Sequence, residues 1–467
     1  MIFETVAQLK LATLTAGQLV STKGYYASGD GGAADYIVAA TQAVDGYGDH
    51  ALAGGTVALL QAGSLANVKQ YGAKGDGATD DSASLQAACS TGGVVYIPEG
   101  TYLVKDIDLS GAFLQGAGSR SILKDNGSAT FTYVDTTTGA TEMRDITLDG
   151  NSGTIKCAEY SSNSSAVYSN VNIQNYGGRC VFFEQGTRNV QVTGGTCENL
   201  GGEAYVAKGL ISRFVGIHFG SNTGHAIRFG RFNGDANIPT GHYSVVEACT
   251  FKDVLNNPVL WEINAGNGII ANCIATGCRG LYKVDSSTSD GGDAAFNVTA
   301  MGNRVSDMYS IPAGTTTTCF DGDESATQMI IGNFCDGGAD AVNCGSSSIV
   351  QGNTILNVTA YGVRAVGNKC VIEGNIIGSA DIGIYTDGAK NKVHNNQIGP
   401  CPNRGISMTG GAYNSVVGNT LDGSGYNIRL VSSATQTLVN SNISLNPVTA
   451  HISDASSTAV TTGNIGF

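Results

Sequence analysis

The segment Gly374-Asn375-Ile376-Ile377 is one copy of a short pattern that recurs from residue 332 to residue 443. In each copy an Asn is followed, within one or two positions, by an apolar residue. The other copies are Gly332-Asn333-Phe334, Gly352-Asn353-Thr354-Ile355, Asn395-Asn396-Gln397-Ile398, Gly418-Asn419-Thr420-Leu421 and Ser441-Asn442-Ile443. Their Asn residues lie 20, 22, 21, 23 and 23 positions apart. A period near 22 predicts a solenoid whose stacked coils share one core.

The residues between the Asn positions indicate strands rather than helices. Apolar and polar residues alternate over four to six positions, as in Gly383-Ile384-Tyr385-Thr386, and a period of two is typical of β-strands. Gly and Asn cluster between these runs, which suits turns that need positive φ. We therefore predict an all-β parallel solenoid. The repeated Asn side chains are expected to form a hydrogen-bonded ladder along the stack, with a structural and not a catalytic role.

Composition and charge exclude several classes of protein. The 467 residues include 66 Gly and carry a formal net charge of −13, without a Lys/Arg-rich stripe. Such a chain is a poor partner for nucleic acid. No apolar run reaches the roughly 18 residues of a membrane span. Residues Met1–Thr5 do not begin a secretion signal, so we expect synthesis in a cytoplasm and release by another route.

The twelve cysteines are predicted to be small buried core residues. Cys249 and Cys273 lie 24 residues apart, about one coil, and no paired C-x-x-C motif recurs. This spacing favours neither a disulfide framework nor a zinc site. We expect no metal ion and no cofactor.

The first part of the chain predicts two further units. Residues 1–66 are expected to form a separate module with a short helix near Glu4 and strands on either side of a Gly-rich turn at residues 29–32. That turn lacks the Gly-Lys-Ser/Thr sequence of a phosphate loop. Residues 67–88 then predict a strand, a turn and a helix capped by Asp80 or Asp81, which closes the end of the stack.

The segment Asn67–Val104 resembles the opening of the pectin-lyase-like right-handed parallel β-helix superfamily. In that superfamily Tyr-Gly-Ala-x-Gly-Asp-Gly-x-Thr-Asp-Asp leads into a capping helix, and the same residues stand here at positions 71–81. The upstream segment, with Gly24-Tyr25-Tyr26 and the Gly-Asp-Gly-Gly run, is similar to the N-terminal module of bacteriophage tailspike proteins. The resemblance implies a homotrimer of parallel β-helices that binds, and usually cleaves, a bacterial surface polysaccharide. It carries over no catalytic residue.

The middle coils carry the candidate site. One strand of each coil can be aligned by its leading residues, and in the middle coils this strand bears charge. Because stacked coils lie about 4.8 Å apart, residues one coil apart face the same patch of solvent. Glu262 and Asp285 lie 23 residues apart, so we expect their carboxyl groups within about 5–9 Å of each other. That is the separation that paired carboxylates use in glycoside hydrolysis.

Other residues complete this hypothesis. The middle coils carry longer insertions at residues 231–242, 285–295 and 308–326. Glu247 and Asp235 are alternative catalytic carboxylates, as are Asp321, Asp323 and Glu324 in the third of these insertions. The candidate substrate-binding residues are Trp261, Arg228, Arg231, His225, His242, Tyr282 and Lys283. Two alternatives remain open. Glu262 and Lys283 can form a simple surface ion pair, or His225, Arg228, Arg231, His242 and Tyr243 can serve β-elimination from a uronic acid.

The sequence thus predicts a right-handed parallel β-helix with a small N-terminal module and a capping helix. The expected domains are an attachment module (1–66), a catalytic and receptor-binding β-helix (67–446) and a C-terminal cap (447–467). The expected function is that of a phage tailspike that hydrolyses a capsular or O-antigen polysaccharide. A polysaccharide lyase and a non-enzymatic adhesin are the alternatives. The expected partners are the glycan, two further copies of the chain and a tail or baseplate protein bound by the N-terminal module, with the protein located in the virion and acting at the bacterial surface.

Overall fold

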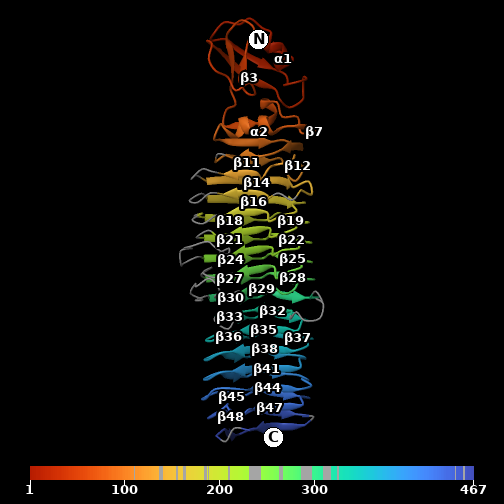
Figure 1. Ribbon diagram of the computed structural model, residues 1–467, viewed down its shortest axis with the longest axis vertical. Coiled ribbons are helices and arrows are strands. Elements are labelled where there is room, and N and C mark those ends of the chain that lie inside the picture. Colours follow the sequence, from red (N-terminus) through yellow and green to blue (C-terminus); the bar gives the residue numbers. More distant parts are fainter. Residues whose placement is uncertain are drawn as a thin grey trace. The chain divides into compact units, whose positions relative to one another are not determined.

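The structure is a computed structural model of the chain. It describes all residues except 110, 136–139, 154–155, 161–164, 184–186, 188, 209–210, 231–242, 262–266, 285–296, 309–316, 323–325, 448, 456–457 and 467. The chain divides into two compact units, Met1–Tyr205 and Val206–Phe467. The predicted fold class is confirmed, because both units contain coils of a right-handed parallel β-helix (Figure 1).

The first unit opens with a five-stranded sheet in the order β1-β2-β3-β5-β4. Val6 and Leu9 of the short helix α1 pack into its core together with Tyr36 and Val38. Thr5 caps this helix by accepting a hydrogen bond from the Gln8 N–H. The elements are β1 (Ile2–Phe3), α1 (Val6–Lys10), β2 (Leu19–Thr22), β3 (Ala34–Ala39), β4 (His50–Ala51) and β5 (Val57–Leu60).

The first coils follow directly. Strand β6 pairs in parallel with β8, and β7 with β9. The elements are β6 (Leu65–Asn67), η1 (Val68–Tyr71), β7 (Asp76–Asp80), α2 (Ser82–Cys89), β8 (Val94–Ile97), β9 (Gly100–Val104), β10 (Ile107–Asp108), β11 (Phe113–Gly116), β12 (Ser121–Asp125), β13 (Phe131–Asp135), β14 (Ala140–Asp149), β15 (Lys156–Tyr160), β16 (Ser165–Gln174), β17 (Val181–Phe183), β18 (Asn189–Thr193), β19 (Thr196–Glu198) and β20 (Tyr205–Ala207).

The predicted capping helix is α2, which buries Leu85, Ala88 and Cys89. The two predicted capping residues, Asp80 and Asp81, have different hydrogen-bond partners. Asp80 accepts a hydrogen bond from the Ser82 N–H at 3.0 Å. Asp81 occupies the N-cap position, but its carboxylate accepts instead from the N–H groups of Lys74 and Gly75, which fixes the preceding turn.

In the second unit each regular coil contributes two strands to a wide sheet and one strand to a narrow sheet, all parallel. The wide sheet contains β21 (Ile211–Val215), β22 (His218–Gly220), β24 (Tyr243–Glu247), β25 (Thr250–Lys252), β27 (Asn267–Ala271), β28 (Ile274–Thr276), β30 (Asn297–Met301), β31 (Arg304–Ser306), β33 (Thr327–Ile331), β34 (Phe334–Asp336), β36 (Ile349–Gln351), β37 (Thr354–Leu356), β39 (Val371–Glu373), β40 (Ile376–Ile377), β42 (Lys392–His394), β43 (Gln397–Ile398), β45 (Ser415–Val417), β46 (Thr420–Asp422), β48 (Leu438–Asn440), β49 (Ile443–Leu445) and β51 (Val460–Thr462).

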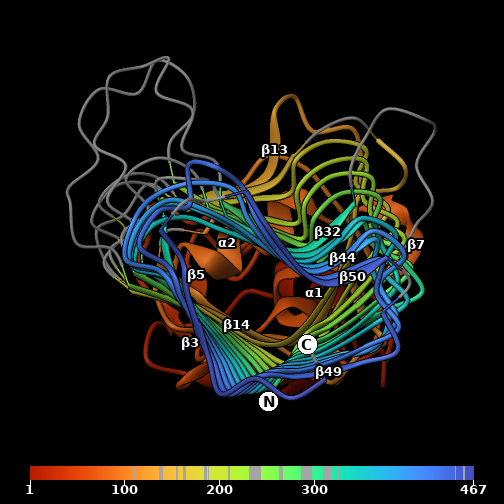
Figure 2. The same ribbon diagram turned by 90° about the horizontal axis from the view of Figure 1, so that it is seen from below.

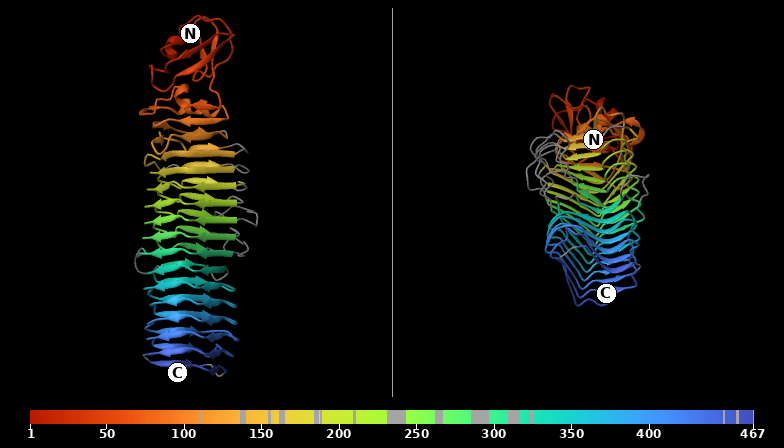
Figure 3. Two further views of the ribbon diagram at one scale, coloured as in Figure 1. Left: turned by 180° about the vertical axis from the view of Figure 1, so that it is seen from behind. Right: turned by 60° about the horizontal axis from the view of Figure 1, so that its bottom comes forward.

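The narrow sheet contains β23 (Ile227–Phe229), β26 (Val259–Trp261), β29 (Tyr282–Val284), β32 (Thr318–Asp321), β35 (Asp340–Cys344), β38 (Tyr361–Val366), β41 (Ile382–Asp387), β44 (Arg404–Met408), β47 (Tyr426–Leu430) and β50 (Ala450–Asp454). In the end-on view β32, β44 and β50 lie on the side opposite β49 (Figure 2). The view from behind shows the coils of this unit stacked in register (Figure 3).

The predicted asparagine ladder is confirmed in the second unit. Each Asn donates a side-chain N–H to the side-chain oxygen of the Asn one coil further on, at 2.9–3.1 Å, along the series Asn303, Asn333, Asn353, Asn375, Asn396, Asn419, Asn442 and Asn464. The residue before each rung adopts a positive φ, as at Gly374 (64°) and Ser441 (53°). Gly at most of these positions removes the steric cost of that conformation.

The cysteine prediction holds for ten residues and is wrong for two. Ten cysteines are free and buried. Cys319 and Cys335 form a disulfide with Cα atoms 6.6 Å apart. Cys319 lies on β32 of the narrow sheet and Cys335 on β34 of the wide sheet, so the two strands meet across the core. Their separation of 16 residues does not match the coil period, and so the spacing gave no sign of the pair.

The period also continues into residues 447–467. Strand β50 pairs with β47, and β51 pairs with β48, both in parallel. Asn464 supplies the last rung of the asparagine ladder. These residues therefore form a further coil on the stack.

Replacing Asn375 by Ala tests the ladder. The Asn375 side-chain oxygen accepts from the N–H and the side-chain amide of Asn353, and its amide donates to Asn396 and to the Val350 carbonyl. Buried groups left without partners cost about 1–3 kcal/mol each, so we expect the free energy of unfolding to fall by about 3 kcal/mol. Denaturant unfolding measures the loss. Asn464→Ala, at the less buried end of the ladder, is the control, and equal losses for the two variants would contradict this role.

Candidate functional site

The outward column of the narrow sheet in the middle coils begins with Arg228. Strand register pairs Arg228 with Leu260, and Leu260 with Lys283. Arg228 and Lys283 are partly exposed and lie two coils apart, about 10 Å. The register therefore places two cationic side chains on one column, with the buried Leu260 between them.

The predicted carboxylates of this site lie outside the described residues. Glu262, Asp285 and Asp235 belong to that group, together with Arg231, His242, Asp323 and Glu324. The strands that precede the first two are described. Trp261 and Val284, the residues directly before Glu262 and Asp285, are paired in register.

The prediction that Trp261 and Tyr282 bind substrate is wrong, because both side chains are 0% exposed. Trp261 stacks on Phe229 with ring centroids 5.6 Å apart, and its indole N–H donates to the Ser244 hydroxyl at 2.8 Å. Tyr282 donates to the Gln328 side chain at 2.6 Å. Side chains alternate between the two faces of a strand, so Trp261 and Tyr282 point into the core when Leu260 and Lys283 point outward.

Glu247 and His225 occupy different surroundings. Glu247 lies on β24 of the wide sheet and accepts a hydrogen bond from Arg213 at 3.2 Å, so it does not join the narrow-sheet column. His225 precedes β23 and donates from Nδ1 to the Asn257 carbonyl at 2.6 Å. This hydrogen bond places the proton on Nδ1, and in the neutral ring the basic nitrogen is then Nε2.

The narrow sheet carries a second set of functional side chains that the sequence reasoning missed. Two outward columns run over β38, β41, β44 and β47. The first is Tyr361, Ile382, Arg404 and Tyr426, and the second is Arg364, Tyr385, Ser407 and Arg429. We call Tyr361, Arg364, Tyr385, Arg404, Tyr426 and Arg429 the arginine–tyrosine tract.

A sequence signal for this tract exists. The four strands begin Tyr-Gly-Val-Arg (361–364), Ile-Gly-Ile-Tyr (382–385), Arg-Gly-Ile-Ser (404–407) and Tyr-Asn-Ile-Arg (426–429). Aligning them on their second residue brings the outward positions into columns. The same strand therefore bears charge in these regular coils as well as in the middle coils.

The tract borders a buried carboxyl group, Asp340, which is 8% exposed. Burial raises the pKa of Asp340, although a hydrogen bond from the Tyr361 N–H and the charge of Arg364 act in the opposite direction. The neighbouring carboxylate of Asp321 raises the pKa further. Asp321 accepts a hydrogen bond from the Asn343 amide at 3.2 Å. A carboxyl group with a raised pKa beside a second carboxylate is the arrangement that separates a general acid from a base.

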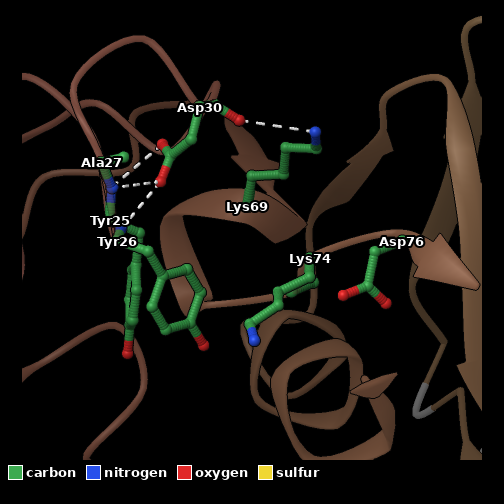
Figure 4. A pocket seen from close by; sticks show the side chains of 8 residues that line it. Tyr25, Tyr26, Ala27, Asp30, Lys69, Lys74 and Asp76 are labelled. Atoms are coloured by element: carbon green, nitrogen blue, oxygen red, sulfur yellow. Dashed lines mark hydrogen bonds between the residues drawn. The ribbon is translucent and has the colours of Figure 1, made fainter. Parts of the chain in front are cut away.

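A pocket of about 280 Å³ lies in the first unit, lined by Tyr25, Tyr26, Ala27, Asp30, Lys69, Ala73, Lys74 and Asp76 (Figure 4). The backbone N–H groups of its Gly-rich turn resemble an anion nest, but the Asp30 carboxylate fills it. Asp30 accepts from the N–H groups of Tyr25, Tyr26, Ala27 and Gly32 at 2.7–3.1 Å. The turn therefore binds its own side chain.

The described parts of the chain hold neither a cluster of metal-binding side chains nor a membrane-spanning helix. They contain no group of three or more His, Cys, Asp or Glu side chains placed to hold a metal ion. They also contain no helix that is long and apolar enough to cross a lipid bilayer.

Replacing Asp340 by Asn tests its buried charge. Because the folded state raises its pKa, Asp340 destabilises the folded protein as pH rises through that pKa, and has no such effect when protonated in both states. We expect Asp340→Asn to raise the midpoint of thermal unfolding at about pH 7 and to leave it unchanged at about pH 3.5. The exposed Asp381→Asn is the control. A lower midpoint for Asp340→Asn at neutral pH would contradict the assignment.

Comparison with one solved structure supports the fold, and two others are also similar. WceF of Pantoea stewartii, a glycan biofilm modifying enzyme with a bacteriophage tailspike-like parallel β-helix fold, aligns with a TM-score of 0.51 and 12% identity, covering 70% of this chain and 50% of WceF. The tailspike protein gp49 of Acinetobacter baumannii bacteriophage Fri1, a capsular polysaccharide depolymerase, gives a TM-score of 0.38 and 14% identity, covering 100% and 75%. The A-module of a mannuronan C-5 epimerase of Azotobacter vinelandii gives 0.34 and 15%, covering 86% and 98%.

Comparisons of the sequence are more specific. No curated protein sequence matches this chain. The family model of NosD, a periplasmic copper-binding protein, matches residues 296–465. The family model of rhamnogalacturonase A/epimerase, pectate lyase-like, matches residues 65–300, about half of the chain. With the parallel coils described above, this match establishes that the protein belongs to the rhamnogalacturonase A/epimerase, pectate lyase-like family.

Proposed function

We propose that this protein is a phage tailspike depolymerase that binds a bacterial capsular or O-antigen polysaccharide and hydrolyses its glycosidic bonds. The observation that carries the proposal is the register of β26 and β29. Their pairing puts the buried Leu260 beside the partly exposed Lys283, and the next residues after both strands are the acids Glu262 and Asp285. Family membership and the glycan-modifying relatives support a carbohydrate substrate.

The proposed reaction uses the two acids on opposite sides of one glycosidic bond. One carboxylic acid donates its proton to the leaving oxygen, and the bond between that oxygen and the anomeric carbon breaks. The other carboxylate either attacks the anomeric carbon or removes a proton from the attacking water. Mutual repulsion separates the pKa values of two neighbouring carboxylates, so that one stays protonated. Arg228 and Lys283 flank the site and orient acidic groups of the substrate.

β-Elimination is the second candidate, and His225 favours it. Its Nδ1–H bond to the Asn257 carbonyl leaves Nε2 as the basic nitrogen. A base in this state can remove the proton next to a uronate carboxylate, while the nearby Arg228 neutralises the carboxylate charge. This chemistry yields an unsaturated sugar, which hydrolysis does not.

The proposed assembly is a homotrimer of chains that meet along the wide sheet. On its outer face six successive positions, Val245, Ile269, Thr299, Met329, Ile349 and Val371, are paired in register and none is charged. We call this column the apolar strip. Ile269 and Met329 are 40% and 39% exposed. Chains with a net charge of −13 repel each other, so a contact between copies requires an uncharged surface of this kind.

The proposed function also includes attachment of the protein to a phage particle. The N-terminal sheet attaches the protein to a tail or baseplate protein, so that the protein is located in the virion and acts at the bacterial surface. A non-enzymatic adhesin built on the same fold would bind the same glycan without cutting it.

The Glu262→Gln and Asp285→Asn variants test the reaction. We expect each to lower the rate of polysaccharide cleavage by at least about 100-fold, because each removes an acid or base. Falling viscosity and new reducing ends on the host polysaccharide measure turnover, and ultraviolet absorbance of unsaturated uronate identifies a lyase. Glu373→Gln on the wide sheet is the matched control. Full turnover in both variants rejects the site, and intact polysaccharide with the wild type supports the adhesin.

The Ile269→Glu/Met329→Glu double variant tests the assembly. Negative charges on the apolar strip are expected to convert a three-chain particle into single chains, because each copy would bury them against its neighbour. Light scattering coupled to size-exclusion chromatography gives the mass. Thr359→Glu, at an exposed position between β37 and β38, should remain trimeric. A wild type that elutes as a single chain refutes this proposal.

A further inference from the structure

A histidine lies in the core of the N-terminal sheet without a hydrogen-bond partner. His50 on β4 is 0% exposed, and neither of its ring nitrogens has a donor or an acceptor among the described residues. Its ring lies beside the rings of Tyr25 and Tyr36, with centroids 5.8 Å and 5.7 Å away. A proton on this imidazole would therefore create an unpaired charge in an aromatic, water-free environment, which is costly.

Two charged groups act on this histidine from neighbouring elements. Burial is the largest influence, and with Lys10 at the end of α1 it lowers the pKa of His50 from 6.5 to about 4, although Asp45 acts in the opposite direction. Asp49 precedes His50 in the chain, but its carboxylate accepts a backbone N–H of β5 at 2.8 Å. The other ionisable side chains packed around this segment are the phenols Tyr25, Tyr36, Tyr47 and Tyr71.

Tyr25 connects this histidine to the first coil of the solenoid. Its ring meets the His50 ring edge to face. The same ring lies so close to the Gly72 backbone that a Cβ on Gly72 would stand 2.7 Å from it. The Tyr26 ring lies 4.8 Å from that of Tyr25, and its hydroxyl donates to the Gly72 carbonyl at 2.8 Å. A displacement of Tyr25 therefore disturbs the contact with the first coil directly.

The remaining contacts of this junction are hydrogen bonds between η1 and the Gly-rich turn (Figure 4). Three side chains at 2.8–3.4 Å donate to backbone carbonyls of the turn and the residue after it, Asn67 to Gly31, Lys69 to Asp30 and Gln70 to Ala33. All of them require the conformation of the turn that also positions Tyr25 and Tyr26. The junction and the core around His50 thus depend on the same segment.

The pH dependence of this arrangement has a definite sign. An exposed His50 takes up a proton near pH 6.5, and the buried one does so only near pH 4. As pH falls through this interval, the open state binds a proton that the closed state does not, so the free energy of opening decreases. The same relation makes the open fraction up to about 70-fold larger at pH 4.5 than at pH 7.5.

The other titrating groups near the junction act in another pH range or in the opposite direction. Burial alone would raise the pKa of Asp30, but bonds from backbone N–H groups lower it below 3.8, so this carboxylate keeps its charge at pH 4.5. Burial raises the pKa values of Asp49 and Asp81, so their protonation in acid favours the folded state. The asparagine ladder of the second unit consists of amides, which do not titrate.

We propose that His50 makes the junction between the N-terminal sheet and the first coil sensitive to acid. Protonation drives the imidazole out of the core, displaces Tyr25 and frees the Gly-rich turn from η1, while the coils of the second unit stay folded. The inference goes beyond the proposed reaction and does not depend on it. It rests on the proposed function only for the role of the sheet as an attachment module, whose connection to the β-helix acid would loosen.

Amide hydrogen exchange of the full-length protein, read by mass spectrometry and corrected for the intrinsic exchange rate at each pH, tests this inference. We expect residues 24–72 to exchange up to about 70-fold faster at pH 4.5 than at pH 7.5. Residues 371–398 of the second unit should keep their protection. Deuterium exchange at the imidazole C2 position of the same protein should give His50 a pKa of about 4.

Two variants remove the titrating group. His50→Leu replaces it by an apolar side chain and His50→Gln by a polar one, and both should abolish the acid-dependent opening. The matched control is His394→Gln on β42, because burial lowers the pKa of this histidine too, and it should leave the opening unchanged.

Four results would overturn the inference. They are equal protection of the wild type at both pH values, acid-dependent opening that persists in both His50 variants, a pKa near 6.5 for His50 in the folded protein, and loss of protection along the whole chain at pH 4.5. None of these readouts depends on cleavage of a polysaccharide.

Discussion

The vertical register of the coils is the constraint on which the rest of the structure depends. Every strand of a coil hydrogen-bonds to its equivalents above and below, and the buried asparagine ladder fixes the same register at one turn of each coil. Removing one asparagine of the ladder leaves buried donors and acceptors without partners. This lowers the free energy of unfolding far more than the loss of an exposed hydrogen bond does. The register therefore cannot slip by a residue, and residues about 22 positions apart remain vertical neighbours.

Because the register is constant, equivalent side chains of successive coils form vertical columns, and different columns have different compositions. Inward columns bring Phe229, Trp261 and Tyr282 into one aromatic cluster, in which Trp261 stacks on Phe229 and meets Tyr282 edge to face. Outward columns on the wide sheet collect uncharged residues into the apolar strip, and those on the narrow sheet collect arginines and tyrosines. One scaffold thus places the proposed association surface and the proposed glycan surface on different sheets. Each coil adds about 4.8 Å of length to both, which suits a polymeric ligand.

The two cationic regions of the narrow sheet are compatible with one function. Arg228 and Lys283 lie on the strands β23 and β29, and the arginine–tyrosine tract follows on later coils of the same sheet. A polysaccharide held at a distance from the scissile bond is less free to dissociate, so remote contacts contribute to positioning at the reacting atoms. The Gly-rich turn of the first unit differs from these cationic regions. Its backbone N–H groups at Tyr25, Tyr26, Ala27 and Gly32 already donate to the Asp30 carboxylate, which stabilises the turn.

The sequence by itself determined the solenoid, the strand period, the asparagine ladder, the capping helix and the superfamily, because each depends on local spacing that one coil repeats in the next. Only the tertiary structure decided that Trp261 and Tyr282 face the core, that Glu247 lies on the wide sheet, and that Cys319 bonds to Cys335. The reason is geometric. The spacing of the repeats determines which residues are vertical neighbours. Whether a side chain faces the core or the solvent depends on the residue at which its strand begins, and the spacing does not give that residue.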